Sequence, residues 1–161
     1  MRKHNQEIKS KDIINTILSN SKICRIAMID NGRPYLLPFN YGYKDNCIYI
    51  HSAPEGKKIE ILKRNNEVCF EIEDHTEIIK NSKPCKCATK YRSVVGYGNV
   101  EIITDNEQKK NGLDIIMTHN GIPTENNVYE KSQVELLVIL KLNITQISGK
   151  QSSNWLDEQI K

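Results

Sequence analysis

Hydrophobic residues are spaced in two different ways along this chain, and the two spacings predict strands and helices. In residues 67–73 every second position is Val, Phe or Ile, which is typical of a strand with one buried face. In residues 10–20 the isoleucines and a leucine recur at helical spacing, which predicts a short amphipathic helix. The chain is therefore expected to combine long strands with short helices.

Two turn signals divide the first third of the chain. Asn31-Gly32 lies between two strand-like segments and is a strong signal for a two-residue hairpin. Asp45-Asn46 marks a second tight turn. Together they predict an antiparallel meander, in which the middle strand bends where a proline and a glycine interrupt it. The three strands are expected at residues 23–30, 33–44 and 47–51.

The pattern beyond these strands adds two helices and three more strands. We expect a helix at 53–65, a strand at 67–73, an irregular surface segment at 75–87, a strand at 88–104, a helix at 105–119, a loop at 121–129 and a strand at 134–147. Six antiparallel strands with few parallel crossovers favour a small closed or partly open barrel. The predicted fold is mainly β with peripheral helices, in a single domain over residues 1–161.

Composition and charge narrow the classes of function. Hydrophobic residues make up 38% of the chain and charged residues 27%, as in ordinary soluble proteins. No apolar run approaches the ~20 residues needed to cross a bilayer, and the N-terminus has no apolar signal core. We therefore expect a cytoplasmic protein without a membrane partner. A net charge of +3, evenly spread, gives no indication of nucleic-acid binding.

The five cysteines predict neither disulfides nor a metal site. An odd count in a chain without a signal segment indicates reduced thiols. Cys24, Cys47 and Cys69 lie in strand-like apolar runs, where a small buried side chain is expected. Cys85 and Cys87 form the one close pair, and no second Cys/His pair stands at zinc spacing.

The start of the helix after residue 52 is the best candidate binding site. Ser52 and Glu55 have the spacing of a capping box. Lys57 and Lys58 follow in the first turns, where positive side chains oppose the helix dipole. Free backbone amides and two ammonium groups together favour an anion, most simply a phosphate. The alternative is two solvated lysines on an ordinary helix.

Three other segments carry candidate binding groups. His51 ends its strand beside the proposed phosphate site, although a lone histidine is more often structural. Arg92, flanked by strand-forming residues, needs a carboxylate, a phosphate or open water as its partner. The irregular segment 38–41 could offer backbone amides and carbonyls to a planar heterocycle, or it is a bulged barrel strand. No Walker loop, dinucleotide fingerprint, nucleophile elbow or zinc-protease motif is found.

The element order and two segments resemble the pyridoxamine-phosphate-oxidase-like FMN-binding split barrels, and most closely their nitroimidazole-resistance branch. The segments are H-S-A-P-E-G-K-K at residues 51–58 and Y-R-S-V-V-G-Y-G at residues 91–98. The likeness covers about residues 13–149, the expected core of the domain. It implies a six-stranded antiparallel split β-barrel that binds FMN at a homodimer interface, with both subunits contributing.

The resemblance also assigns roles to particular residues. The phosphate and ribityl end would be held by Ser52, Lys57 and Lys58. The isoalloxazine edge would be lined by Pro38, Phe39, Asn40 and Tyr41. The site would be completed by Tyr91, Arg92 and Ser93, from the opposite face or the other subunit. His51 matches the active-site histidine of the nitroimidazole-resistance branch.

These implications leave three hypotheses. The first is an FMN-dependent oxidoreductase that reduces a small acceptor such as a nitroaromatic compound, with His51 contacting the substrate or passing a proton. The second is a non-catalytic flavin-binding module or sensor. The third is a small barrel that binds single-stranded nucleic acid, which the scattered tyrosines do not favour.

The tail after Ser148 lacks the arginine and histidine that pyridoxamine phosphate oxidases use, so vitamin B6 phosphates are not the expected substrates.

Overall fold

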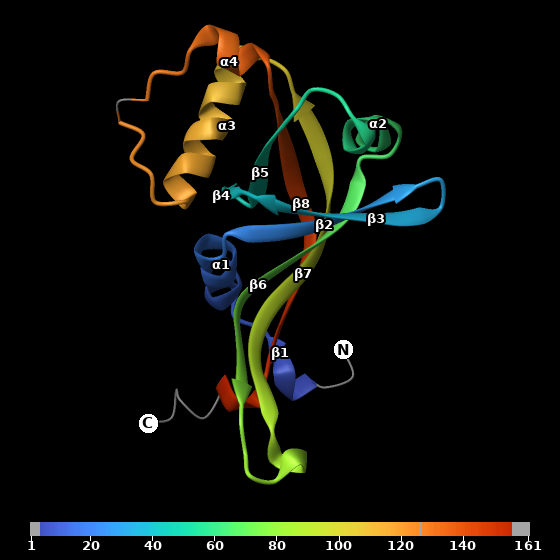
Figure 1. Cartoon of the computed structure of the whole chain (residues 1–161), viewed down its shortest axis with the longest axis vertical. Coiled ribbons are helices and arrows are strands. Elements are labelled where there is room, and N and C mark those ends of the chain that lie inside the picture. The colour runs from blue at the N-terminus through green and yellow to red at the C-terminus, as the bar shows by residue number, and fades with distance from the viewer. Residues whose placement is uncertain (1–3, 126, 156–161) are drawn as a thin grey trace.

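The fold is built on one antiparallel sheet (Figure 1). The computed structural model describes residues 4–125 and 127–155. The strands of the sheet are β1 (Glu7–Ile8), β2 (Ile23–Asp30), β3 (Arg33–Asn40), β4 (Gly42–Lys44), β5 (Cys47–Ser52), β6 (Glu67–Ile79), β7 (Ala88–Ile103) and β8 (Val138–Gln151). The α-helices are α1 (Lys11–Asn20), α2 (Lys57–Arg64), α3 (Asn106–His119) and α4 (Lys131–Glu135). Short 3₁₀ turns occur at His4–Gln6, Pro84–Lys86 and Ser153–Trp155.

The sheet is a barrel that does not close. Its strands follow the order β3-β2-β6-β7-β8-β5-β4, and β1 adds to β8. The two strands at the ends of this order, β3 and β4, are joined in sequence through Tyr41 alone, so the sheet must curl back on itself. No ladder joins β3 to β4 or β5 within the described residues. The predicted split barrel is confirmed, and its six long strands are supplemented by the short β1 and β4.

Both predicted hairpin turns have the required backbone geometry. Asn31 and Gly32 have φ angles of 51° and 79°, and Asp45 and Asn46 have φ angles of 51° and 59°. Two successive positive φ angles define the type I′ turn, whose twist matches that of the flanking strands. The pairs Asp30 with Arg33 and Lys44 with Cys47 close the two turns.

The core fills the inside of the curled sheet. It includes the fully buried side chains of Tyr41, Ile50, Phe70 and Ile72. The Tyr41 hydroxyl donates to the carbonyl oxygen of Leu18 on α1 at 2.7 Å, which ties this helix to the barrel.

No helix within residues 4–125 and 127–155 has the length and apolar character of a membrane span.

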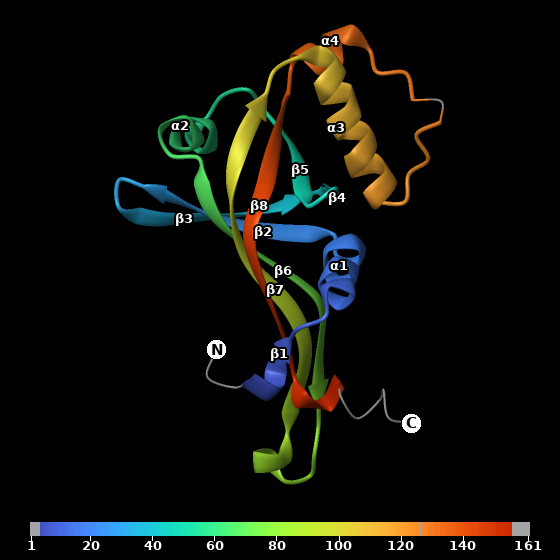
Figure 2. The ribbon, with the colours of Figure 1, turned by 180° about the vertical axis from the view of Figure 1, so that it is seen from behind.

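Two predicted boundaries were wrong because long-range pairing decided them. β6 continues to Ile79 rather than ending at residue 73, since residues 75–79 pair with 88–92 of β7. The resulting hairpin arm extends well beyond the barrel (Figure 1, Figure 2). The last strand occupies 138–151 rather than 134–147, because the short helix α4 precedes it and Gln151 pairs with Arg92. The predicted irregular segment at 75–87 is thus confined to residues 80–87.

Candidate functional site

One edge of β3 has no strand partner and can hydrogen-bond a ligand. In a two-residue hairpin the residues flanking the turn are hydrogen-bonded to each other, and the pairing alternates from there. The odd positions from Arg33 to Phe39 therefore bond to β2, and the even positions turn their backbone groups to the unpaired edge. Pro34 and Pro38 both occupy even positions, where a missing N–H costs no ladder bond. The unpaired edge accordingly offers the N–H groups of Leu36 and Asn40 and several carbonyl oxygens.

The predicted capping box of α2 was wrong. Ser52 is still part of β5, where it pairs with Val138 of β8, and its buried hydroxyl donates to the carbonyl oxygen of Ala53 at 2.9 Å. The helix begins later, and its N-cap is Gly56, with a φ of 106° and no side-chain cap. Only glycine adopts this φ without strain. The ladder with β8 outweighs the local capping signal.

The backbone amides at the start of α2 are nevertheless free. Gly56 accepts from the N–H groups of Ile59 and Glu60, at 2.9 and 3.2 Å. Within the described residues, the N–H groups of Lys57 and Lys58 have no hydrogen-bond partner. These donors and the helix dipole are the usual elements of an anion site.

Two cationic side chains of α2 bind one carboxylate of the β2–β3 hairpin. The Lys57 Nζ lies 3.0 Å from a carboxylate oxygen of Asp30 and 4.7 Å from the ring centre of Tyr35. The guanidinium of Arg64 is 2.9 Å from the other oxygen of Asp30. A cavity of about 460 Å³ lies at this corner, lined by Asp30, Asn31, Arg33, Pro34, Tyr35 and Lys57. With Arg33 and Lys57 against one carboxylate, the cavity carries a net positive charge.

A second cavity of about 320 Å³ joins two of the predicted residues at the other end of β3. It is lined by Asn40, His51, Leu113, Ile116, Met117, Asn120 and Ile122. Asn40 ends β3 and His51 lies near the end of β5, so the cavity bridges the split between these strands. α3 supplies Leu113, Ile116 and Met117. The His51 side chain is exposed and has no hydrogen-bond partner among the described residues.

The segment 38–41 exposes only half of its side chains. Pro38 and Asn40 are exposed, whereas Phe39 packs against the core and Tyr41 is fully buried. Burial raises the pKa of the Tyr41 phenol well above its ordinary value. The side chains of Phe39 and Tyr41 are therefore not available to a ligand, and the backbone of Phe39 is already bonded to β2.

Tyr91, Arg92 and Ser93 lie far from the other candidate residues within one chain. His51 pairs with Ile139, and Ile139 pairs with Ile103 of β7. Ser93 is ten residues away from Ile103 on the same strand, a distance of about 33 Å at the rise of an extended strand. Figure 1 shows this part of β7 in the hairpin arm. The structure thus brings together the residues near α2, β3 and β5, but not these three.

Arg92 already has a carboxylate partner within its own chain. Its Nε donates to Asp74 at 3.0 Å, and its Nη2 donates to the second oxygen of the same carboxylate. Its guanidinium carbon lies 4.6 Å from the ring centre of Trp155. The partner that the sequence required for Arg92 is therefore Asp74.

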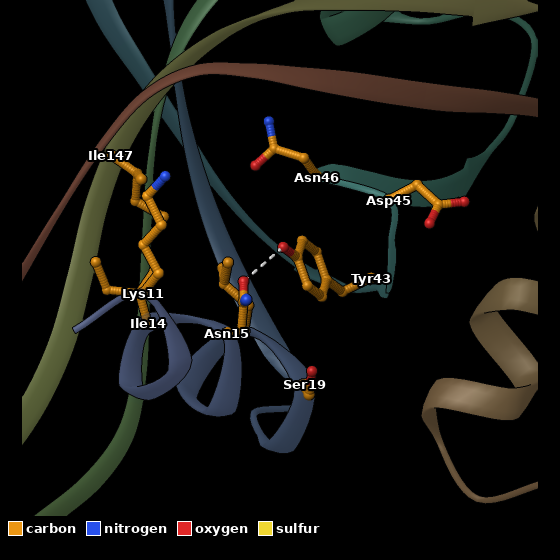
Figure 3. A pocket seen from close by; sticks show the side chains of 9 residues that line it. Lys11, Ile14, Asn15, Ser19, Tyr43, Asp45, Asn46 and Ile147 are labelled. Carbon is orange, nitrogen blue, oxygen red and sulfur yellow. Dashed lines mark hydrogen bonds between the residues drawn. The ribbon is translucent and has the colours of Figure 1, made fainter.

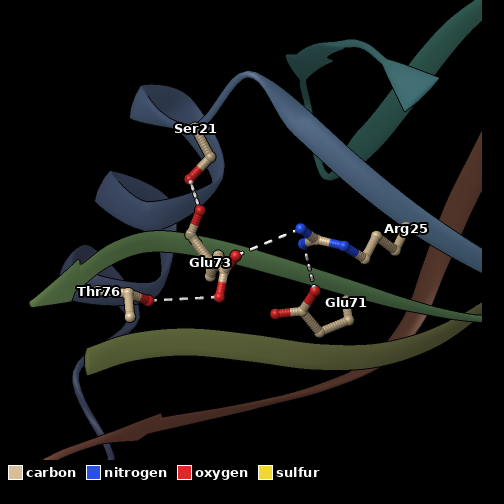
Figure 4. A network of polar contacts seen from close by, with 5 residues as sticks. All are labelled: Ser21, Arg25, Glu71, Glu73 and Thr76. Atoms are coloured by element: carbon tan, nitrogen blue, oxygen red, sulfur yellow. Dashed lines mark hydrogen bonds and ion pairs between the residues drawn. The ribbon is translucent and has the colours of Figure 1, made fainter. Parts of the chain in front are cut away.

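Exposed apolar side chains form a patch on the outer face of the sheet. Its apolar members are Ile23, Ile29, Leu36, Val95 and Tyr97. Leu36, the most exposed at 58%, pairs with Ala27, which in turn pairs with Cys69 beside Tyr97. Next to this row Arg25 bonds Glu71 and Glu73, and Glu73 also contacts Ser21 and Thr76 (Figure 4). Patches of this kind mark contact surfaces.

A larger cavity lies away from every predicted residue. It measures about 840 Å³ and lies between α1 and the β4–β5 turn (Figure 3). Within it the hydroxyl of Tyr43 donates to the side chain of Asn15 at 3.0 Å. Neither this cavity nor the wall formed by α3 was predicted, because neither has a local signal in the sequence. Arg33 and Asp30 were also missed, although a charged pair flanking an Asn-Gly turn was visible in the sequence.

Comparisons with known proteins identify a family. The family model described as pyridoxamine 5'-phosphate oxidase matches residues 10–151. A crystal structure from Bacteroides thetaiotaomicron, provisionally described as a 5-nitroimidazole antibiotic resistance protein, is 34% identical, with a TM-score of 0.80. The match covers 90% of this chain and 86% of that one. A comparison with curated proteins gave no significant match.

Two more distant structures share the fold. The flavocytochrome Anf3 of Azotobacter vinelandii is 19% identical with a TM-score of 0.81, over 94% of this chain and 72% of that one. A protein of Mycobacterium smegmatis that binds FAD and heme is 18% identical with a TM-score of 0.80, over 91% and 73% of the two chains. At these identities the likeness concerns the fold alone.

Proposed function

This chain belongs to the pyridoxamine 5'-phosphate oxidase family, and from that membership we propose that it is a flavoprotein that binds FMN and reduces small acceptors such as nitroimidazoles and other nitroaromatic compounds. The observation that carries the proposal is the positive corner where the β2–β3 hairpin meets the start of α2. There, the unpaired N–H groups of Lys57 and Lys58 and the cationic side chains of Lys57 and Arg33 lie near the unpaired edge of β3. A phosphate and a planar ring, joined by a short chain, fit this arrangement.

The phosphate end has both charge and donors. The N–H groups of Lys57 and Lys58 are free to bond phosphate oxygens, and the Lys57 ammonium and Arg33 guanidinium neutralise their charge. Asp30 holds Lys57 in position, and Arg64 shares that carboxylate. The donor set therefore fits a phosphate and not a neutral ligand.

The unpaired edge of β3, where the flavin ring would lie, has backbone N–H groups and carbonyl oxygens. The N–H groups of Leu36 and Asn40 and the carbonyl oxygens between them can bond the polar edge of an isoalloxazine ring. When bound, FMN supplies the hydride and electron transfer. Pro38 and Asn40 orient the ring, and His51 contacts the acceptor or passes a proton to it, a role that histidine commonly has in general acid–base catalysis.

We propose that the working unit is a homodimer. Within one chain, Tyr91, Arg92 and Ser93 lie ten or more residues along β7 from Ile103, the β7 residue two strands away from His51. Ten residues of extended strand span about 33 Å, so these residues can complete a flavin site only on a partner subunit. The apolar patch around Leu36 provides the contact surface.

The five cysteines are unpaired, which fits a reducing compartment such as the cytoplasm.

Substitution of Lys57 tests the phosphate end. Lys57→Ala removes a charge-assisted contact worth about 1.5–3 kcal/mol, so the Kd of FMN should rise roughly 10- to 150-fold. Lys63→Ala is the matched control, since Lys63 is an exposed lysine in the last turn of the same helix. Fluorescence titration of FMN into flavin-free protein measures both. Equal affinities would place the phosphate elsewhere.

Substitution of His51 tests the reaction. In anaerobic protein, a nicotinamide donor should bleach the flavin and a nitroimidazole should reoxidise it. His51→Ala should slow the reoxidation while FMN stays bound. A flavin that binds but is never reoxidised by nitroaromatic acceptors would instead indicate a non-catalytic module.

A further inference from the structure

The cavity of about 320 Å³ beside His51, here called the α3 cavity, has a lining with a distinct chemistry. Its wall consists of Leu113, Ile116 and Met117 from α3 and Ile122 from the turn that follows. Asn40, His51 and Asn120 complete it, and no aspartate, glutamate, lysine or arginine lines it in the part of the chain that the structure describes. A volume near the lower limit for ligand sites suits a small molecule.

The side-chain amides of Asn40 and Asn120 in this lining already have hydrogen-bond partners within the protein. The Asn40 Nδ2 donates to the carbonyl oxygen of Lys22 and to the Asn120 Oδ1, at 3.2 and 2.9 Å. The Asn120 Nδ2 donates to the Asn40 Oδ1 and to the carbonyl oxygens of Tyr41 and Ile116. His51 is left as the polar group without a partner among the described residues. A ligand in the cavity would thus meet apolar walls and a single imidazole.

The wall is held rigidly against the barrel. A Cβ at Gly42 would lie 2.7 Å from backbone atoms of Ile115 and Ile116, so α3 approaches β4 as closely as a glycine permits. The end of α3 is a Schellman motif, in which Ile122 N–H bonds the Met117 carbonyl and Gly121, with a φ of 79°, bonds the Thr118 carbonyl. This motif places Ile122 beside Met117. The size of the cavity is therefore set by side chains.

We propose that the α3 cavity is the acceptor subsite and that Met117 and Ile122 determine its specificity for small, uncharged, flat molecules. The inference rests on the proposed function, since Asn40 and His51 belong both to the proposed flavin site and to this cavity. An uncharged apolar lining excludes anionic acceptors, because it offers a buried charge no counterion. It equally excludes phosphorylated substrates.

A pair of nearly isosteric probes tests this assignment. para-Nitrobenzamide is neutral and para-nitrobenzoate is anionic. Each is titrated into FMN-loaded protein, with the perturbation of the flavin absorption as the signal, and into flavin-free protein by calorimetry. We expect para-nitrobenzamide to bind at least ~10-fold more tightly than para-nitrobenzoate, since the benzoate would bring an unpaired charge.

Filling the cavity should weaken this binding. Met117→Trp, and Ile122→Trp at the cavity mouth, should each raise the Kd of para-nitrobenzamide at least ~10-fold, since even one methylene matters in a hydrophobic pocket. Neither should change the Kd of FMN. Val128→Trp is the control, because Val128 is 91% exposed in the neighbouring loop, and this variant should bind like the wild type.

The outcomes separate this inference from the proposed function. If FMN binds and both cavity variants bind para-nitrobenzamide as the wild type does, the subsite is wrong while the flavin proposal stands. Equal affinity for the two probes would also overturn it. If the wild type binds no flavin, the proposed function fails, and the calorimetric titration of flavin-free protein still decides whether the α3 cavity takes a neutral ring.

Discussion

Replacing Asp74 with asparagine should destabilise the hairpin arm, because it removes the carboxylate that holds Arg92. Asp74 is the extra residue of a β-bulge, at the point where the β6–β7 register shifts between Glu73 and His75. A bulge turns its side chain out of the regular alternation. Here it aims the carboxylate at Arg92 across the hairpin.

The burial of this pair sets the size of the effect. The side chain of Asp74 is 5% exposed and that of Arg92 is 17% exposed. Removal of one partner from a buried ion pair costs about 3–5 kcal/mol, because the other charge stays buried without compensation. At about 2–4 °C per kcal/mol for a chain of this length, the melting temperature should fall by roughly 6–20 °C.

Urea or thermal unfolding at a fixed protein concentration measures the loss. The matched control is Glu107→Gln, a similar carboxylate-to-amide change in the exposed pair of Glu107 with Lys110, whose oxygen–nitrogen distance is 2.8 Å. Exposed pairs of this kind contribute at most ~1 kcal/mol. If Asp74→Asn cost no more than Glu107→Gln, the ion pair would not stabilise the arm.

Three further predictions concern α3, pH and assembly. Gly42→Ala should cost about 1–3 kcal/mol, since its Cβ would overlap the α3 backbone; an unchanged thermal midpoint would contradict the close approach. Burial lowers the pKa of His119 from its ordinary 6.5, and its Nε2–H donates to the Ser21 carbonyl. The unfolded chain therefore binds the proton more readily, and stability should fall as the pH drops below about 6.5; thermal scans of His119→Gln should show a shallower decline, and an equal decline would assign the effect to other groups. Leu36→Glu places a charge in the apolar patch and should yield monomers in sedimentation experiments, whereas an undiminished dimer would move the interface elsewhere.

Local signals in the sequence predicted the barrel well. The positive φ angles of Asn31 and Gly32 depend on those two residues alone, so the first hairpin and its register follow from them. The alternation in residues 67–73 likewise fixed the buried face of β6, with Val68, Phe70 and Ile72 in the core.

Features decided by long-range contacts were not predictable in the same way. The signal of Ser52 for a helix cap was overridden by its pairing with Val138, far along the chain. The extension of β6 depends on its partner β7, because residues 75–79 have no apolar alternation of their own.

The candidate site shows the same division. Lys57 and His51 could be proposed from the sequence because a strand runs directly into the start of a helix there. The wall of the α3 cavity combines Asn40 with residues near 120, and only the folded chain brings them together. That Arg92 is paired with Asp74 also required the structure, since a bulge sets the position of the carboxylate.

Identification of the chromophore released from the purified protein tests the central claim most directly. The released compound is separated by chromatography, identified by mass and quantified against the chain. The account predicts FMN in a one-to-one ratio, with the Lys57→Ala protein retaining less of it than the Lys63→Ala protein. A colourless protein that fails to take up FMN on reconstitution would contradict it.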